Sequence, residues 1–370
     1  MNESTKKLKL EEQIALFLKK IGITFNKEKV LGKGSFGEIY EVVDQFGRIF
    51  AMKILKKNIS HITAKDKLKA LVKKLQKEVA IQMSLKASTV IRGVWCGHTM
   101  INKELLYFVI MEKAFLKNLN YLIQYFHYSP GFEILCKDEN YWFNRLSENT
   151  ARYLMYNVFY AIEYLHRSNI VHLDIKPSNI LLVRGYKAKL SDFSISSNQN
   201  KNDKDKKFTL IGGTHNYLGP EAYTQHKEID ECYADRVDIF ALGMTLYYVM
   251  YNSFLDERIK NYSNMMNEGK YSYDEVVNMV NKIRERINDS TVSEELKEFM
   301  NRMVVADYKE RADIYELIDM KWINGKKEMM RSLNEINEEE GQKMFIELQK
   351  SEYYEKKDTK KKKKFKYNRK

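Results

Sequence analysis

The chain has 370 residues, of which 44% are hydrophobic, and it carries a net charge of +13 at pH 7. This length suits one large domain or two coupled lobes, and the hydrophobic content excludes a disordered chain. No apolar run approaches the roughly 20 residues that a membrane-spanning helix needs, and residues 1–20 lack the apolar core of a signal peptide. We therefore expect a soluble, cytoplasmic protein without a transmembrane segment.

The basic charge is concentrated in the last 15 residues. Residues 356–370 contain ten Lys or Arg and one Asp, a net +9, which leaves +4 for the other 355 residues. A nucleic-acid-binding surface on the folded part is therefore not indicated. We expect this tail to be a solvated, disordered extension, while nuclear import or contact with a phosphate or membrane surface stays open. Cys96, Cys136 and Cys232 form no C-x-x-C pair, which disfavours a zinc site or a disulfide framework.

Strands are predicted in the first third of the chain. Residues 24–55 alternate apolar and polar side chains, and 44–47 predict the turn between a strand that ends at Val43 and a strand over Ile49–Leu55. Residues 66–86 change to a period of three to four, which predicts an amphipathic helix. Leu105–Met111 is a continuous apolar run that suits a buried strand.

Helices dominate the rest of the chain. Ser147 is the predicted cap of a long helix that runs to Ser168, and residues 237–250 and 294–305 are helical again. The polar stretch 198–207 predicts a mobile loop. A strand-rich part followed by a helix-rich part indicates two lobes of different class, which is an α+β fold.

A glycine-rich motif, G-x-G-x-x-G, lies at Gly32, Gly34 and Gly37. In a dinucleotide-binding fold this motif opens a helix, but here residues 38–42 predict a strand, which disfavours that fold. The pattern fits a hairpin that lies over nucleotide phosphates, where glycine permits a close approach of the backbone.

Lys53 stands among apolar strand residues, in Ala51-Met52-Lys53-Ile54. Burying an ammonium group is costly unless anions lie near it, so phosphates and a carboxylate are implied. Glu78, at the border of the inward face of the predicted helix 66–86, can supply the carboxylate. A surface lysine and a solvated glutamate are the alternative for either residue alone, and the set as a whole favours the paired interpretation.

The most specific segment runs from Ile170 to Leu181, with the pattern D-x-K-P-x-N. Asp174 can accept the proton of an attacking hydroxyl, Lys176 can neutralise a transferring phosphoryl group, and Asn179 can bind magnesium. Asp192, thirteen residues later in Asp192-Phe193-Ser194, is a second oxygen ligand. A chance loop rich in turn-forming residues does not explain both motifs together.

Together these residues resemble the eukaryotic protein kinases of the serine/threonine type. The resemblance implies a bilobal fold, with a small antiparallel β-sheet lobe and a larger, mainly helical lobe. It implies an N-terminal extension 1–23, a kinase domain 24–323 (N-lobe 24–111, hinge 112–115, C-lobe 116–323) and a disordered tail 324–370 that is acidic and then Lys-rich.

The resemblance also implies the site. The expected catalytic residues are Asp174, Lys176, Lys53 and Glu78, and the expected metal ligands are Asn179 and Asp192, with ATP and Mg²⁺ bound between the lobes. The expected activation-segment residues are Ser194, Thr209, Thr214 and Glu221, whose buried partner is Arg311. Asp238 and Gly243 match a further helix motif. The expected ATP-binding residues are Leu31, Gly32, Lys33, Gly34, Ser35, Phe36, Gly37, Ile39, Ala51, Lys53, Met111 (the gatekeeper), Glu112, Ala114 and Leu181.

Three residues depart from the family pattern. Leu173 replaces an arginine that pairs with a phosphate on the activation segment, so phosphorylation at Thr209 should matter less for ordering. Ser194 replaces a glycine and should restrict rotation of the backbone at Asp192. Gln82 replaces an apolar residue.

The acceptor, partners and alternatives are inferred from single residues. Lys176 and Thr214 favour a serine or threonine acceptor, and the segments 174–179, 254–259 and 333–340 resemble the calcium/calmodulin-dependent protein kinase kinases, whose substrates are activation loops of other kinases. The tail does not support calmodulin binding. Because of Ser194 and Leu173, an inactive pseudokinase scaffold stays an alternative. The segment 214–221 argues against a small-molecule kinase.

Overall fold

The computed structural model describes residues 10–34, 37–58, 69, 72, 76, 79–101, 104–114, 116–128, 146–183, 187–203, 205–210, 212–251 and 272–325, with the backbone alone for 33–34, 57–58 and 125–128. The chain divides into two compact units, Met1–Ala114 and Phe115–Lys370. The predicted boundaries of lobes, hinge and tail stay predictions.

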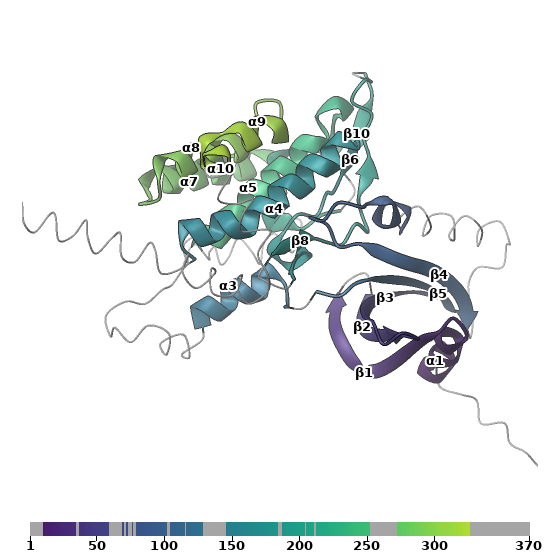
Figure 1. Cartoon of the computed structure of the whole chain (residues 1–370). Coiled ribbons are helices and arrows are strands. Elements are labelled where there is room, and N and C mark those ends of the chain that lie inside the picture. The colour runs from purple at the N-terminus through teal and green to yellow at the C-terminus, as the bar shows by residue number, and fades with distance from the viewer. Residues whose placement is uncertain are drawn as a thin grey trace, which may run out of the picture. The chain divides into compact units, whose positions relative to one another are not determined.

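A five-stranded antiparallel sheet forms the first unit (Figure 1). Its spatial order is β1-β2-β3-β5-β4, so only the last two strands depart from chain order. The turn predicted at 44–47 joins β2 to β3, and the predicted buried strand is β5, as the alternating and continuous apolar patterns indicate. The strands are β1 (Ile23–Gly34), β2 (Gly37–Asp44), β3 (Ile49–Asn58), β4 (Gly93–Ile101) and β5 (Glu104–Glu112).

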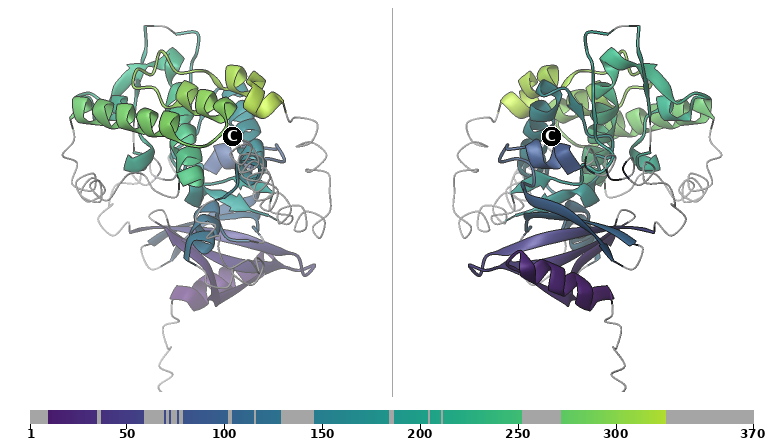
Figure 2. Two further views of the ribbon diagram at one scale, coloured as in Figure 1. Left: turned by 90° about the vertical axis from the view of Figure 1, so that its left-hand side faces the viewer. Right: turned by 90° about the vertical axis from the view of Figure 1, so that its right-hand side faces the viewer.

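Helix α1 (Leu10–Lys20) covers one face of this sheet (Figure 2). Its inward side chains Ile14 and Leu18 are buried and pack into one apolar cluster with alternate residues of the strands. The helix begins with acidic and ends with basic side chains, which suits its dipole. This part of the stretch 1–23, predicted only as an extension, therefore packs into the core of the first unit.

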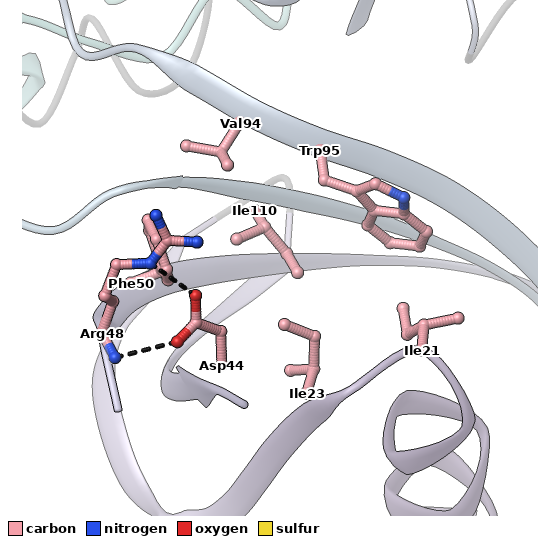
Figure 3. A pocket seen from close by; sticks show the side chains of 8 residues that line it. All are labelled: Ile21, Ile23, Asp44, Arg48, Phe50, Val94, Trp95 and Ile110. Carbon is pink, nitrogen blue, oxygen red and sulfur yellow. Dashed lines mark hydrogen bonds and ion pairs between the residues drawn. The ribbon is translucent and has the colours of Figure 1, made fainter. Parts of the chain in front are cut away.

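The same face of the sheet has a shallow hollow beside α1 (Figure 3). It is lined by Ile21, Ile23, Asp44, Arg48, Phe50, Val94, Trp95 and Ile110. Arg48 donates to the Asp44 carboxylate from its side chain at 2.7 Å and from its backbone at 2.9 Å. Ile110 belongs to the α1 cluster and Phe50 packs against it, so this hollow lies on the α1 face of the sheet. The side chain of Lys53 points to the other face.

The second unit is built mainly of helices, with α4 and α5 packed against each other (Figure 1). The helices are α3 (Leu119–Tyr128), α4 (Glu148–Arg167), α5 (Asp235–Tyr251), α7 (Tyr273–Asp289), α8 (Glu294–Met303), α9 (Ile314–Asp319) and α10 (Lys321–Asn324). Short strands pair as β6 (Ile170–Val171) with β9 (Ser197–Asn198), β7 (Ile180–Leu182) with β8 (Ala188–Leu190), and β10 (Lys207–Thr209) with β11 (Glu228–Asp230). Single 3₁₀ turns are η2 (Pro177–Asn179), η4 (His215–Tyr217), η5 (Pro220–Tyr223) and η6 (Glu231–Tyr233).

Helix α4 begins and ends where the sequence predicts. The Ser147 hydroxyl accepts a hydrogen bond from the backbone N–H of Thr150, and Ser168 ends the helix. The α4 residue Arg152 donates to the backbone oxygen of Trp322 at 2.9 Å and stacks on its ring. This contact ties the buried core helix to the last described helix, so the described part of the second unit extends at least to α10.

Four sequence expectations fall at least partly on described residues. Of the described residues of the predicted helix 66–86, residues 69, 72, 76 and 79–84 are helical, whereas 85 and 86 are not, so the helix ends two residues earlier than predicted. In the predicted loop 198–207, Lys201 and Lys206 form ion pairs with Asp235 and Glu231, elsewhere in the second unit, and the mobility of this loop stays a prediction. The described residues contain no helix long and apolar enough to cross a membrane. Cys96 and Cys232 are free thiols, and Cys136 lies outside the described residues.

Candidate active site

Lys53 lies on the face of the first sheet opposite α1. Because Met52 and Ile54 belong to the α1 cluster, Lys53 must point to the other side. In the antiparallel register Lys53 stands between Ile39 on β2 and Val109 on β5. The next row places Ala51 between Glu41 and Met111. We call these six residues the Lys53 face: Ile39, Glu41, Ala51, Lys53, Val109 and Met111.

The predicted ATP-binding residues of the first unit differ in how deeply they are buried. Ala51 and Met111 are buried and Lys53 and Ile39 are half-buried, whereas Leu31 is 44% exposed. Glu112 donates its backbone N–H to Arg92 at 2.9 Å and, like Ala114, is half-buried. The predicted residues Ser35, Phe36 and Glu78 lie outside the described residues, and Lys33 and Gly34 are described by their backbone alone.

The glycine-rich motif forms a β-hairpin between β1 and β2, as predicted, and not the start of a helix. Gly34 pairs with Gly37, and Gly32 pairs with Ile39. Gly37 has φ 139°, and a Cβ there would lie 2.2 Å from the backbone oxygen of Ile54. Gly37 is therefore required by the close approach of the neighbouring strand β3, a reason that the sequence did not reveal. A Cβ at Gly32 would meet no atom of the described residues within 4 Å, which fits the predicted approach to phosphate.

Gln82, the polar residue at an apolar family position, is buried and donates a hydrogen bond to the backbone oxygen of Ile91. Its amide is thereby satisfied inside the first unit.

In the second unit Asp174 is the centre of a hydrogen-bonded group. Its Oδ2 accepts from Lys176 Nζ at 2.7 Å and from Asn179 Nδ2 at 2.9 Å. Its Oδ1 accepts from the Thr214 hydroxyl at 2.7 Å, and Lys176 also donates to that hydroxyl at 2.7 Å. Asp174 is only 6% exposed, so charged hydrogen bonds stabilise its carboxylate in a shielded place. The residues of D-x-K-P-x-N and Thr214, forty residues apart, therefore meet.

Asn179 connects this group to Asp192. Its backbone oxygen accepts hydrogen bonds from the backbone N–H and the hydroxyl of Ser191, at 2.9 Å and 2.8 Å. Ser191 precedes Asp192, whose φ of 63° lies in the left-handed region. Phe193 is buried against the ring of His172. The two predicted metal ligands are thus held by one short network within the second unit, and Leu181, on the neighbouring strand β7, is half-buried.

Asp238 on α5 supports the backbone of the catalytic segment. Its buried carboxylate accepts the backbone N–H groups of His172 and Leu173, both at 2.8 Å, and contacts His166 Nε2 at 2.9 Å. Leu173 has φ 68°, an unfavourable value for a branched side chain, and these bonds hold it there. Gly243 lies five residues after Asp238 on α5. A Cβ at this position would be 2.8 Å from the Cβ of Met303, so glycine permits close packing of α5 on α8.

Leu173 is buried in an apolar cluster that also contains residues of the activation segment. We call this the Leu173 cluster: Val171, Leu173, Phe208, Leu210, Leu218, Ala222, Ile229, Ala234 and Val237. The departure from the family arginine is thus accompanied by apolar contacts to β10 and to the residues around Leu218. Ser194 precedes Ile195, which packs against this cluster, and is half-buried in the turn that follows Phe193.

Ion pairs attach the activation segment to the rest of the second unit. Lys201 pairs with Asp235 at 2.8 Å and Lys206 with Glu231 at 2.9 Å. Asp230 on β11 forms ion pairs with Lys207 on β10 and with Lys309. The hydrogen bonds from Lys207 and then from Lys309 lower the pKa of Asp230 to about 2. Thr209 is exposed on β10 and stands opposite Glu228.

Glu221 and Arg311 form the predicted buried pair. Both guanidinium Nη atoms donate to the carboxylate at 2.7 Å, and the two side chains are 3% and 0% exposed. Arg311 also donates to the backbone oxygens of Val305, Arg236 and Ala306, and its charge lies over the ring of Phe240. Tyr217 lies between Thr214 and Glu221 in the chain, and burial raises the pKa of its hydroxyl.

Sequence reasoning overlooked two elements of the site. Ser191 is one residue before the predicted metal aspartate, and its position in the D-F motif could have marked it. The ion pairs of Glu41 with Lys29 and Lys113 join residues far apart in the chain, and no spacing rule indicates them. Lys53 and Asp192 belong to different units, and their convergence on one nucleotide stays a prediction.

Comparison with known proteins agrees with this geometry. A family model described as "Protein kinase domain" matches residues 25–323. An Aurora kinase of Yarrowia lipolytica is 31% identical over 225 residues, which are 60% of this chain and 51% of that protein.

Two further relatives align over more of the chain. The cell cycle serine/threonine-protein kinase CDC5/MSD2 of Saccharomyces cerevisiae is 25% identical over 83% of the chain and 38% of its own length. The calcium/calmodulin-dependent protein kinase type II of Caenorhabditis elegans is 26% identical over 82% and 36%. The chain spans less than two thirds of the length of these relatives.

Proposed function

Because the chain belongs to the protein kinase domain family, we propose that it transfers the γ-phosphate of ATP to serine or threonine hydroxyls of protein substrates. The observation that carries the proposal is the shielded carboxylate of Asp174, held between Lys176, Asn179 and Thr214. Such an arrangement suits a reaction in which a hydroxyl must be placed and its proton accepted.

Asp174 acts on the acceptor. Each carboxylate oxygen can accept two hydrogen bonds, and Oδ1 receives one from Thr214. The acceptor hydroxyl donates the second, which aims its oxygen at the phosphorus and gives its proton a destination. Lys176, already 2.7 Å from Asp174 Oδ2, neutralises negative charge that develops on the phosphoryl oxygens. The Thr214 hydroxyl, bonded to both Asp174 and Lys176, is itself a short aliphatic alcohol at this place, which supports serine or threonine as the acceptor.

The nucleotide is held by the Lys53 face and the glycine hairpin. The Lys53 ammonium would contact phosphate oxygens, and the apolar side chains of Ala51 and Met111 would pack against the base. Catalysis then consists mainly of placement and charge neutralisation.

The predicted Mg²⁺ ligands fit a hard cation. Asn179 Nδ2 donates twice to Asp174, so the remaining polar atom of the amide, Oδ1, is an oxygen of the type that Mg²⁺ prefers. Asp192 supplies the carboxylate, from a backbone position fixed by the neighbouring Ser191. When bound, Mg²⁺ neutralises phosphate charge. The residues of this chain fix the position of its two oxygen ligands.

An active enzyme is favoured over a pseudokinase scaffold. The described residues with a proposed chemical role are of the residue types that the kinase pattern requires. The activation segment is attached to the second unit through the Leu173 cluster and through ion pairs with Asp230, Glu231 and Asp235. The test is phosphate transfer from Mg-ATP to a generic protein substrate. We expect Asp174→Ala to lower kcat by about 10²- to 10⁴-fold, whereas Asp289→Ala, an exposed carboxylate on α7, leaves it unchanged. Mg-ATP binding without turnover above the Asp174→Ala background would establish the scaffold.

The narrower proposals concern substrate and place. We propose the activation loop of another kinase as substrate, which rests on the resemblance of 174–179, since 254–259 and 333–340 lie outside the described residues. Peptide arrays that include such loops test it, and a preference for unrelated sequences overturns it. We propose a cytoplasmic location, with nuclear import through the tail 356–370 as the variant that a reporter fused to this tail would reveal.

A further inference from the structure

Glu41 on β2 carries a carboxylate shared by two lysines. It accepts hydrogen bonds from Lys113 Nζ and from Lys29 Nζ, each at 2.6 Å. Its side chain is 11% exposed, against 27% for Lys113 and 59% for Lys29. Shielded charged pairs are stronger than exposed ones, so the bond to Lys113 is the stronger of the two. The hydrogen bonds from Lys113 and then Lys29 also hold the pKa of Glu41 below its ordinary value.

The position of Glu41 connects this pair to the nucleotide. Glu41 is the first member of the row Glu41–Ala51–Met111 on the Lys53 face. Lys113 follows Met111 by two residues, in the segment that leaves β5. Backbone pairing of this segment continues through Glu112, which donates to Arg92 at 2.9 Å. Beyond that point the Lys113 side chain anchors the segment back to the sheet.

We propose that Glu41 is a positioning residue for the base of the nucleotide. By holding Lys113, it fixes the backbone of 112–114 at the edge of the row formed with Ala51 and Met111. This inference rests on the proposed function, in which these residues hold adenine. A flat base gains affinity from backbone groups that are already held in place, because little conformational entropy is then lost on binding.

The proposal separates from a purely structural role through the choice of ligand. Adenosine reports on the base site without the phosphates, and it does not need Asp174 or the metal ligands. Lys29→Met is the matched control, because it removes an ion pair from the same carboxylate at a residue of β1 and leaves the β5 exit untouched.

The experiment measures adenosine dissociation constants by calorimetry on the full chain. We expect Glu41→Gln and Lys113→Met each to raise the constant by roughly three- to tenfold, the effect of losing one shielded pair. The double variant should bind adenosine no more weakly than the single variant with the larger dissociation constant, since both substitutions remove the same ion pair. Lys29→Met should stay within about twofold. In turnover assays, KM for ATP should rise, whereas kcat and KM for the peptide should stay unchanged.

Three results would overturn the proposal. One is an unchanged adenosine constant in Glu41→Gln and Lys113→Met, whatever happens to their melting temperatures. The others are an equal effect of Lys29→Met and full additivity in the double variant. If wild-type protein binds adenosine and transfers phosphate while the Glu41 variants match it, this inference alone fails. If wild-type protein neither binds adenosine nor transfers phosphate, the proposed function fails and the inference with it.

Discussion

Replacing Leu173 with alanine tests whether apolar contacts hold the activation segment. The Leu173 side chain is 7% exposed, so the change removes three buried carbon atoms, worth about 2.5 kcal/mol by transfer alone. Core Leu→Ala changes cost about 2–5 kcal/mol once the cavity is included. The rim of the Leu173 cluster consists of half-buried side chains (Ile195, Tyr223 and Tyr308) that can move inward. We therefore expect a loss of about 2–3.5 kcal/mol in the free energy of unfolding.

The decisive measurement is hydrogen exchange of residues 205–218. A local loss of about 2–3 kcal/mol should speed exchange there by roughly 30- to 150-fold. Leu296→Ala is the matched control, because Leu296 is fully buried on α8, outside the Leu173 cluster. It should lower global stability comparably while exchange of 205–218 changes much less. If Leu173→Ala costs under about 1 kcal/mol, or if the two variants show the same exchange in 205–218, the reasoning is wrong.

The remaining predictions concern charge. Arg311→Met leaves its carboxylate partner buried and unpaired, so urea denaturation should show a loss of about 3–5 kcal/mol, against under about 1 kcal/mol for Arg302→Met, whose pair is half exposed. The pKa of Asp230 is about 2 in the folded chain, below its ordinary 3.8, so its contribution to stability is complete above about pH 4 and is lost between pH 4 and 2. Stability-against-pH curves of Asp230→Asn should therefore be flatter in that window, and parallel curves would contradict this. Thr209→Glu should not raise activity and Thr209→Ala should keep it within about twofold, because a negative charge there faces Glu228 across the strand pair; strong activation by the glutamate would refute the argument.

Much of the fold could be predicted because short-range patterns determine it. Ser147 marks the start of α4 through its hydroxyl, and the turn at 44–47 follows from local turn chemistry. The contacts of Asp174 with Lys176 and Asn179 could also be predicted, since these three residues lie within six positions of one segment. These features need only neighbouring residues, which the sequence places side by side.

The rest depends on contacts between distant segments. The missing arginine at Leu173 was visible in the sequence, but its apolar partners come from β10, β11 and α5 and follow no spacing rule. Glu41 and Lys113 meet because β2 and β5 both flank β3, a strand order that composition does not encode. The importance of Gly37 was predicted for a different reason, because the close approach of its neighbour strand β3 depends on the pairing of β2 with β3.

The position of α1 separates two boundaries that are often treated as one. The family match starts at residue 25, but Ile14 and Leu18 of α1 pack on one face of the first sheet. A protein cut at the homology boundary would bare an apolar surface that includes Met52 and Phe108, and such surfaces promote self-association. The autonomous folding unit is thus longer than the domain that similarity recognises, so expression of the catalytic part should begin upstream of Leu10.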